Sequence, residues 1–282
     1  MRVIKIKSNA KINLSLGVLG KLNTKFNRIE SFFSFIDLCD DIQISQISKK
    51  NHKVIFYGKF SKNIPKNNTV TILLKILDSK KLLNNKKYLI KIKKNIPLKS
   101  GMGGGSMNAS SILKYLLEKK IIKLNRSEIN KIVNQIGSDV ILGMEKKNSI
   151  LKGNGEILRS KIKLNLHLLI VKPNFGCSTK NIYNGVRSYS KPALFNIRKS
   201  MFYLNNLINL QNDLEKPAFN KYKKLSEIKS VMLNLPKVLF VRMTGSGSSI
   251  IGYFKSKKTT INGAKLLKKK YRNYWCIISK TI

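Results

Sequence analysis

A dense cluster of glycines within the stretch from Pro97 to Glu118 is the part of the chain best suited to chemistry. Four of the five residues from position 101 to position 105 are glycine. Glycine accepts positive φ angles and has no side chain, so consecutive backbone N–H groups can point toward one spot. Alternation from Tyr88 to Lys93 predicts a strand before the cluster, and apolar residues at helical spacing predict a helix after it. The loop N–H groups and the helix dipole together favour an anion, and phosphate is the anion we expect.

Two familiar nucleotide-binding motifs do not describe this loop. No Lys-Ser or Lys-Thr pair follows the glycines, as a P-loop requires. The dinucleotide fingerprint fails because its sixth position is Ser106 and because no acidic residue ends a strand about twenty residues later. From the residues alone, a tight turn without a ligand is the alternative.

Two other positions carry polar side chains that could serve such a site. Lys11 and Asn13 point to the same face of a strand whose other face is apolar. Asp139 follows a Gly-Ser pair at the end of a predicted helix. Taken alone, Lys11 is a solvated lysine on a half-exposed strand, and Asp139 is a cap or turn residue.

The elements that must position these groups are both strands and helices. Alternation predicts strands, and i, i+3, i+4 spacing predicts helices that begin at polar capping residues. Asn68 or Thr69 is expected to cap one helix, and Ser127 another that ends at Gly137. Gly153–Gly155 is predicted to be a hairpin turn. Further strands are predicted at 3–7, 51–57, 166–171, 238–241, 250–254 and 275–279, and a helix at 259–270.

Composition limits the class of protein. The chain has 282 residues, of which 42% are hydrophobic, enough for a globular core. No run of eighteen apolar residues and no apolar signal core are present, and the three cysteines are scattered. We therefore expect a cytoplasmic protein with free thiols and without a membrane partner. Two histidines are too few for a histidine-based metal site.

The net charge of +43 raises nucleic-acid binding as an alternative. Lysine supplies most of this charge and is spread over the whole chain, whereas surfaces that read bases favour arginine. Lysine, asparagine and isoleucine share A/T-rich codons, so we interpret the charge as a result of genome composition. No nucleic-acid partner is predicted.

Three motifs resemble those of the GHMP kinases, the superfamily of galactokinase, homoserine kinase and mevalonate kinase. Pro97, Gly101, Gly103–Gly105 and Ser106 match its signature Pro-x-x-x-Gly-x-Gly-Gly-Gly-Ser-Ser, although Met107 replaces the second serine. Residues 243–248 are similar to its third motif, Met-[Ser/Thr]-Gly-[Ser/Thr]-Gly-[Ala/Ser]. The opening stretch Ala10–Leu14 and the stretch Ile136–Val140 resemble those of one family within it, the 4-diphosphocytidyl-2-C-methyl-D-erythritol kinases.

The resemblance implies ATP as phosphoryl donor, Mg²⁺ as its counterion and a small-molecule acceptor, cytidine diphosphate-linked methylerythritol. In that family Asp139 would be the catalytic base, with Lys11 setting its electrostatics. The residues implied to bind the nucleotide are Pro97, Leu98, Lys99, Ser100, Gly101, Met102, Gly103, Gly104, Gly105, Ser106 and Met107. The ligand of Mg²⁺ on the protein is unknown, and Ser106 is the nearest candidate.

Substrate recognition is implied at five positions: Asn13, Phe26, Asn27, Thr179 and Tyr183. Phe26 and Tyr183 correspond to an aromatic pair that stacks on cytosine. Tyr183 could instead pack on a helix face. Asn27 stands where the family has histidine, and Lys25 where it has glycine, so a contact that needs an imidazole is in doubt. Asn212–Glu215 matches the family's Asn-Asp-[Leu/Cys]-Glu segment, which we interpret as structural.

The resemblance also implies an α+β fold with two domains, an ATP-binding domain at 1–155 and a substrate-binding domain at 156–282, with the active site in the cleft between them. A monomer or homodimer is expected. Two alternatives stay open. One is another GHMP kinase, such as a homoserine or mevalonate kinase, which would not need the aromatic pair. The other is a nucleic-acid-binding protein that has lost activity, to which the departures at Lys25, Asn27, Met107 and Ser110 could point.

Overall fold

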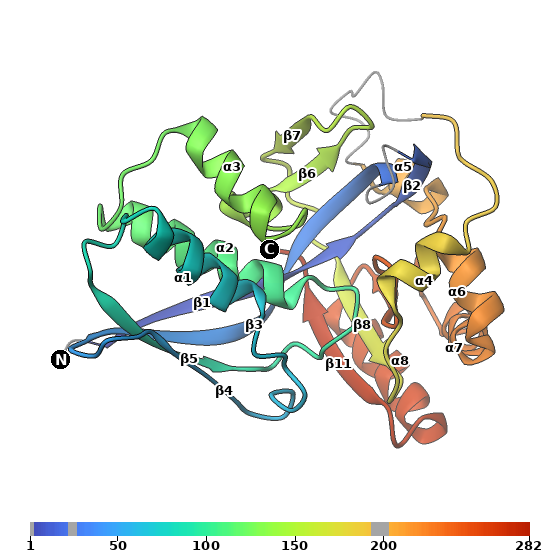
Figure 1. Cartoon of the computed structure of the whole chain (residues 1–282). Helices are drawn as coiled ribbons and strands as arrows, with labels where there is room; N and C mark the ends of the chain where they lie inside the picture. Colours follow the sequence, from blue (N-terminus) through green and yellow to red (C-terminus); the bar gives the residue numbers. More distant parts are fainter. Residues whose placement is uncertain (1–2, 22–26, 193–202) are drawn as a thin grey trace. The chain divides into compact units, whose positions relative to one another are not determined.

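The computed structural model describes residues 3–21, 27–192 and 203–282 (Figure 1). The chain divides into two compact units that are interleaved along the sequence. The first comprises Met1–Lys11, Leu38–Leu98 and Gly103–Lys146, and the second comprises Ile12–Asp37, Lys99–Met102 and Lys147–Ile282. The domain boundary predicted after residue 155 stays a prediction.

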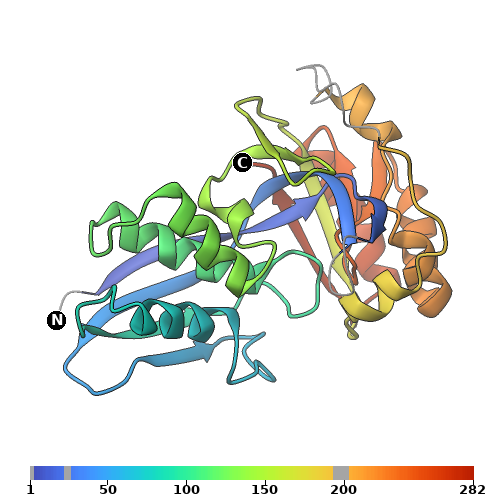
Figure 2. The same cartoon turned by 45° about the horizontal axis from the view of Figure 1, so that its top comes forward.

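Helices cover one face of the strands in the first unit. Strand β4 (Lys53–Tyr57) pairs in parallel with β5 (Lys87–Lys93), and β5 pairs antiparallel with the second half of β3 (Asn27–Ile47). Helices α1 (Thr69–Ser79), α2 (Gly104–Glu118) and α3 (Arg126–Ile136) lie on the same side of these strands in both views (Figure 2). The apolar faces of these helices and the inward side chains of the strands form one buried core. This core includes Leu73 and Leu77 of α1, Ile112 and Leu113 of α2, and Ile90 and Ile92 of β5.

Capping residues begin the helices of this unit. Asn68 caps α1, as predicted, because its side chain accepts the N–H groups of Val70 and Thr71. The expected cap at Ser127 is wrong, because α3 begins two residues earlier, after Asn125. The Asn125 side chain accepts the Glu128 N–H, and the Glu128 carboxylate accepts the Asn125 N–H. This reciprocal capping box satisfies two N–H groups that a cap at Ser127 would leave unpaired. The helix ends at Gly137, as expected.

An antiparallel sheet is the centre of the second unit. Its strand order is β11 (Trp275–Lys280), β8 (His167–Lys172), β10 (Ile250–Phe254) and β9 (Phe240–Met243). Helices α6 (Glu215–Lys221), α7 (Lys223–Leu233) and α8 (Lys257–Lys270) pack their apolar faces into a core with Leu169, Val171, Ile250 and Phe254 of this sheet. The shorter helices α4 (Thr179–Asn184) and α5 (Leu204–Asn209) complete the helices described for this unit.

A second group of strands pairs with the first half of β3 in the same unit. Strand β2 (Gly17–Lys21) and strand β6 (Asn148–Leu151) both pair antiparallel with β3, and β6 forms a hairpin with β7 (Ile157–Ser160). The turn of that hairpin contains Gly153–Gly155, as predicted. Phe32, Phe33 and Phe35 of β3 are buried in the core. Strand β1 (Ile4–Asn13) and β3 contribute residues to both units.

The mixed architecture confirms the α+β class. The short 3₁₀ helix η1 (Ile141–Met144) follows Asp139 after a turn. In the ranges that the structure describes, no helix is both long and apolar enough to cross a membrane.

Candidate active site

The glycine loop leads directly into the N-terminus of α2. Gly103 is the N-cap residue and has a φ of 65°, a left-handed conformation that favours glycine. The N–H groups of the first turn, which begins at Gly104, have no partner within the helix. The first turn also contains no acidic side chain. This end of α2 therefore presents N–H donors and a positive helix dipole to an anion.

A lysine and an aspartate lie next to this helix terminus, within the same unit. Lys11 on β1 forms an ion pair with Asp139, with 3.1 Å between Nζ and Oδ2. The Lys11 side chain is 6% exposed, whereas that of Asp139 is 37% exposed. A Cβ atom on Gly103 would come within 3.0 Å of the Lys11 side chain. The structure thus brings together a buried ammonium, an accessible carboxylate and the glycine loop.

A buried carboxylate beneath the loop was not predicted. Asp40 is fully buried, and its Oδ1 accepts the N–H groups of Asn95 and Ile96 at 2.8 and 2.9 Å. Its Oδ2 accepts the Asn108 side-chain amide of α2 at 3.0 Å and pairs with the ammonium of Lys94. Asp40 therefore ties the segment before the glycines to the helix after them. The signal that could have revealed it is its place on the buried face of β3, in step with Ile42 and Ile44.

The segment Lys99–Met102 is held by the glycine turn that follows β9, residues 244–247, within the second unit. The N–H groups of Ser248 and Ser249 donate to the carbonyl groups of Lys99 and Ser100 at 3.2 and 3.3 Å. The Thr244 hydroxyl donates to the Gly101 carbonyl at 3.3 Å. Gly101 has a φ of 77°, and a Cβ atom there would overlap the Thr244 carbonyl oxygen. Only glycine fits at position 101.

Asn13 lies against the same turn but is itself buried. Its backbone N–H donates to Thr244 Oγ1 at 3.0 Å, and its side-chain amide donates to Ser31 Oγ at 2.7 Å. The residue is 4% exposed. Asn13 thus supports the turn in this structure, and its predicted contact with a substrate stays a prediction.

The remaining residues predicted to bind the substrate differ in exposure and in surroundings. Thr179, at the start of α4, is exposed, and its hydroxyl lies 2.9 Å from that of Ser246 in the glycine turn. Tyr183 is half-buried and packs against the hydrophobic core of the second unit, and Asn27 begins β3. Phe26 lies outside the described residues, so the aromatic pair stays a prediction.

Two titratable groups next to this region serve the fold. The Lys172 ammonium donates to the carbonyl groups of Pro173 and Phe175, both at 2.9 Å, and burial lowers the pKa of Lys172. Burial raises the pKa of the Cys177 thiol to about 11. A thiol with so high a pKa is a poor nucleophile near neutral pH.

No metal centre is built from side chains in the described ranges, where no three His, Cys, Asp or Glu residues come close enough to hold an ion. Mg²⁺ commonly binds one or two protein oxygens together with substrate phosphates and water. The hydroxyl of Ser106 at the start of α2 and the carboxylate of Asp139 are oxygen groups of the kind that mode requires. The donor set therefore fits a nucleotide-bound Mg²⁺ and not a protein cage.

Comparisons with known proteins identify the family. Residues 68–146 match the family profile of the GHMP kinases N terminal domain, and residues 191–273 match that of the GHMP kinases C terminal region. The chain is 55% identical, over 282 residues and the whole of both chains, to a protein of Pelagibacter ubique (strain HTCC1062) named 4-diphosphocytidyl-2-C-methyl-D-erythritol kinase. It is 32% identical to a protein of the same name from Clostridioides difficile (strain 630), over 99% of this chain and 96% of the relative.

The fold is also that of a solved structure. A crystal structure of 4-(cytidine 5'-diphospho)-2C-methyl-D-erythritol kinase superposes with a TM-score of 0.78 at 20% identity, covering 98% of this chain and 99% of the other. The GHMP kinases use ATP as their phosphate donor, and this chain is an ATP-dependent kinase. By its sequence over the full length and by its two matched regions, the chain belongs to the 4-diphosphocytidyl-2-C-methyl-D-erythritol kinase family of GHMP kinases.

Proposed function

We propose that this enzyme transfers the γ-phosphoryl group of ATP to the C2 hydroxyl group of 4-(cytidine 5′-diphospho)-2-C-methyl-D-erythritol, a step in making isoprenoid precursors. The observation that carries the proposal is the Lys11–Asp139 ion pair of 3.1 Å beside the glycine loop. The names of the full-length relatives support the choice of acceptor.

The nucleotide phosphates are proposed to bind at the glycine loop, residues 97–107. The N–H groups at the start of α2 would donate to phosphate oxygens, and the helix dipole would favour their charge. Glycine at 103 and 104 lets the loop pack closely, because a Cβ atom on Gly103 would come within 3.0 Å of the Lys11 side chain and one on Gly104 within 3.0 Å of the Ile96 side chain. The net charge of +43 would speed the encounter with two anionic substrates at low salt.

Asp139 is proposed to accept the proton of the acceptor hydroxyl as the new P–O bond forms. Its 37% exposure leaves it open to a substrate, and the Lys11 ammonium lies 3.1 Å from its carboxylate. Phosphoryl transfer has a loose transition state, so the base must mainly be positioned. Lys11 would also offset negative charge that develops during the transfer.

Recognition of the acceptor is proposed at Asn13, Phe26, Asn27, Thr179 and Tyr183. The aromatic rings of Phe26 and Tyr183 would stack on cytosine. The exposed hydroxyl of Thr179 would act together with that of Ser246, which lies 2.9 Å away.

Mg²⁺ is proposed to be held mainly by the nucleotide phosphates, with Ser106 as the nearest protein oxygen. When bound, it offsets phosphate charge. We further propose a monomer or homodimer in the cytoplasm with no nucleic-acid partner.

The test is ATP turnover with the cytidylylated methylerythritol, homoserine and mevalonate as separate acceptors, for the wild type and for Asp139→Ala. We expect turnover only with the cytidylyl acceptor, and a kcat lower by about 10²–10⁴-fold in the variant. Phosphorus NMR of the product would locate the new phosphate on the C2 oxygen.

Asp78→Ala is the matched control for this variant. Asp78 lies in the same unit, forms an ion pair with Lys87 at 2.7 Å, and has a 32% exposed side chain. It should keep the wild-type kcat. Turnover with homoserine or mevalonate would show that the proposed acceptor is wrong. Equal losses of kcat in the two variants would show that Asp139 is not the catalytic base. Salt-sensitive RNA binding without turnover would contradict the proposed enzyme activity.

A further inference from the structure

The segment Asn212–Glu215 contacts the glycine turn, although no step above uses it. The Asn212 side-chain amide donates to the carbonyl groups of Met243 and Gly245, both at 2.8 Å. The carboxylate of Glu215 accepts the Met243 N–H at 2.7 Å. Asn212 is 3% exposed, so its site excludes water. A substitution that removed the amide would therefore leave the two carbonyl groups without a hydrogen-bond donor.

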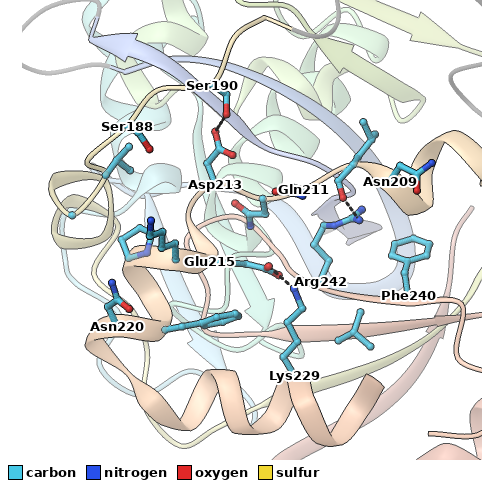
Figure 3. A pocket seen from close by; sticks show the side chains of 18 of the residues that line it. Ser188, Ser190, Asn209, Gln211, Asp213, Glu215, Asn220, Lys229, Phe240 and Arg242 are labelled. Carbon is cyan, nitrogen blue, oxygen red and sulfur yellow. Dashed lines mark hydrogen bonds and ion pairs between the residues drawn. The ribbon is translucent and has the colours of Figure 1, made fainter. Parts of the chain in front are cut away.

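The other side of this segment is fixed to residues that follow β1. The carboxylate of Asp213 accepts the Val18 N–H and the Ser190 hydroxyl, both at 2.7 Å. The Asp213 N–H donates to the Leu16 carbonyl at 2.8 Å. Glu215 also pairs with Lys229 of α7 at 2.5 Å. Figure 3 shows Asp213 turned toward Ser190 and Glu215 turned toward Lys229, at the wall of a pocket of about 1030 Å³. These polar groups of the pocket are therefore already paired within the protein.

The glycine turn also contacts the Lys99–Met102 segment and Thr179, the two parts of the site that belong to this unit. Its neighbours Ser248 and Ser249 bind the backbone of Lys99 and Ser100, and its Ser246 lies beside Thr179. A shift of the turn would displace a part of the nucleotide loop and a predicted substrate contact together.

We infer that Asn212 and Glu215 are positioning residues for phosphoryl transfer. They hold the glycine turn at the position where it supports both the Lys99–Met102 segment and Thr179. The inference rests on the proposed function, which places the nucleotide at the Lys99–Met102 segment and the acceptor at Thr179. A displacement of about 1 Å at such a site costs about 100-fold in rate, because reacting groups must be held in near-attack geometry.

The first test compares Asn212→Ala with Asn148→Ala. Asn148 is a matched control in the same unit: it is 4% exposed, donates to the Ile162 carbonyl at 2.6 Å and accepts the Ser34 hydroxyl at 2.6 Å. We expect both variants to lose thermal stability. Only Asn212→Ala should lower kcat, by about 10- to 100-fold, with each KM within about threefold of the wild type.

Amide hydrogen exchange provides a readout that needs no substrate. Exchange at residues 244–249 should be about tenfold faster in Asn212→Ala than in the wild type, and unchanged in Asn148→Ala. Equal exchange in both variants would show that Asn212 does not hold the turn, whatever the acceptor proves to be. A wild type inactive with the cytidylyl acceptor would instead contradict the proposed function and leave the exchange result standing.

The second test keeps the inference falsifiable if Asn212→Ala does not fold. Glu215→Gln retains an oxygen that can accept the Met243 N–H, whereas Glu215→Ala does not. We expect Glu215→Gln to keep a kcat within about twofold of the wild type and Glu215→Ala to lose about tenfold. Equal kcat values in this pair, or a wild-type kcat in a folded Asn212→Ala, would overturn the inference.

Discussion

The glycine loop before α2 and the glycine turn after β9 are both fixed by buried polar side chains, but Asp40 at the loop and Asn212 at the turn have opposite chemistry. In the first unit the anchor is Asp40, a fully buried carboxylate that accepts the N–H groups of Asn95 and Ile96. In the second unit one anchor is Asn212, a buried neutral amide that donates to the carbonyl groups of Met243 and Gly245.

The difference follows from the backbone groups that each loop leaves unpaired. Unpaired N–H groups need an acceptor, and unpaired carbonyl groups need a donor. A carboxylate is a strong acceptor but brings a charge, so Asp40 is accompanied by the ammonium of Lys94. An amide donates without a charge, so Asn212 needs no counterion. The stability of the protein should therefore depend strongly on the counterion of Asp40, whereas Asn212 has no counterion to lose.

Lys94→Met should give the largest loss of stability. The substitution keeps most of the side-chain volume but leaves Asp40 as a buried, uncompensated charge, so the free energy of unfolding should fall by about 3–5 kcal/mol. Urea denaturation followed by circular dichroism measures this change.

A double variant, Lys94→Met with Asp40→Asn, is the control for this explanation. It removes the unpaired charge while an amide oxygen still accepts the Asn95 and Ile96 N–H groups. It should be more stable than Lys94→Met alone. If the double variant is the less stable of the two, charge is not what distinguishes the anchors.

Gly101→Ala should give the next largest loss. Alanine in a left-handed conformation costs about 1–2 kcal/mol, and the added Cβ would overlap the Thr244 carbonyl oxygen, at a further cost of about 1–3 kcal/mol. Gly155→Ala is the matched control, because Gly155 has a φ of 87° but open space around its Cβ position. Gly155→Ala should lose only the conformational part. Equal losses in the two variants would mean that the turn moves away from position 101 at no cost.

The thiols beside the two anchors should give the smallest effect. Cys177 lies next to Gly247, and burial raises its pKa to about 11. Cys39 precedes Asp40, and its pKa is raised by burial and by the carboxylates of Asp41 and Asp40. Because a raised pKa keeps a thiol neutral, alkylation by iodoacetamide at pH 8 should be slow at both. At Cys177 the rate should increase about tenfold per pH unit toward pH 11.

Asp41→Asn separates the two cysteines. It removes a negative charge near Cys39 and should increase labelling there, with no change at Cys177. Mass spectrometry of the labelled peptides measures both rates in one sample. Rapid labelling of Cys177 at pH 8 would contradict its burial beside the turn.

The sequence alone determined the local features of this protein. Periods of two and of 3.6 residues located most strands and helices α1, α2, α3 and α8, because the inward side chains of each element must be apolar. They did not locate α4, α5, α6 or α7. The glycine cluster predicted the loop that leads into α2, because few other sequences allow such a backbone. Local rules failed at Ser127, because Asn125 with Glu128 forms a reciprocal capping box two residues earlier.

Only the tertiary structure decided which distant groups meet. The ion pair of Lys11 with Asp139, the four contacts of Asp40, and the support that Asn212 gives to the glycine turn all join segments that are remote along the chain. Sequence patterns cannot specify such contacts, because periodicity gives the face on which a side chain lies but not the element that packs against it. Burial then makes each contact obligatory, since a buried charge or backbone polar group without a partner would cost several kcal/mol.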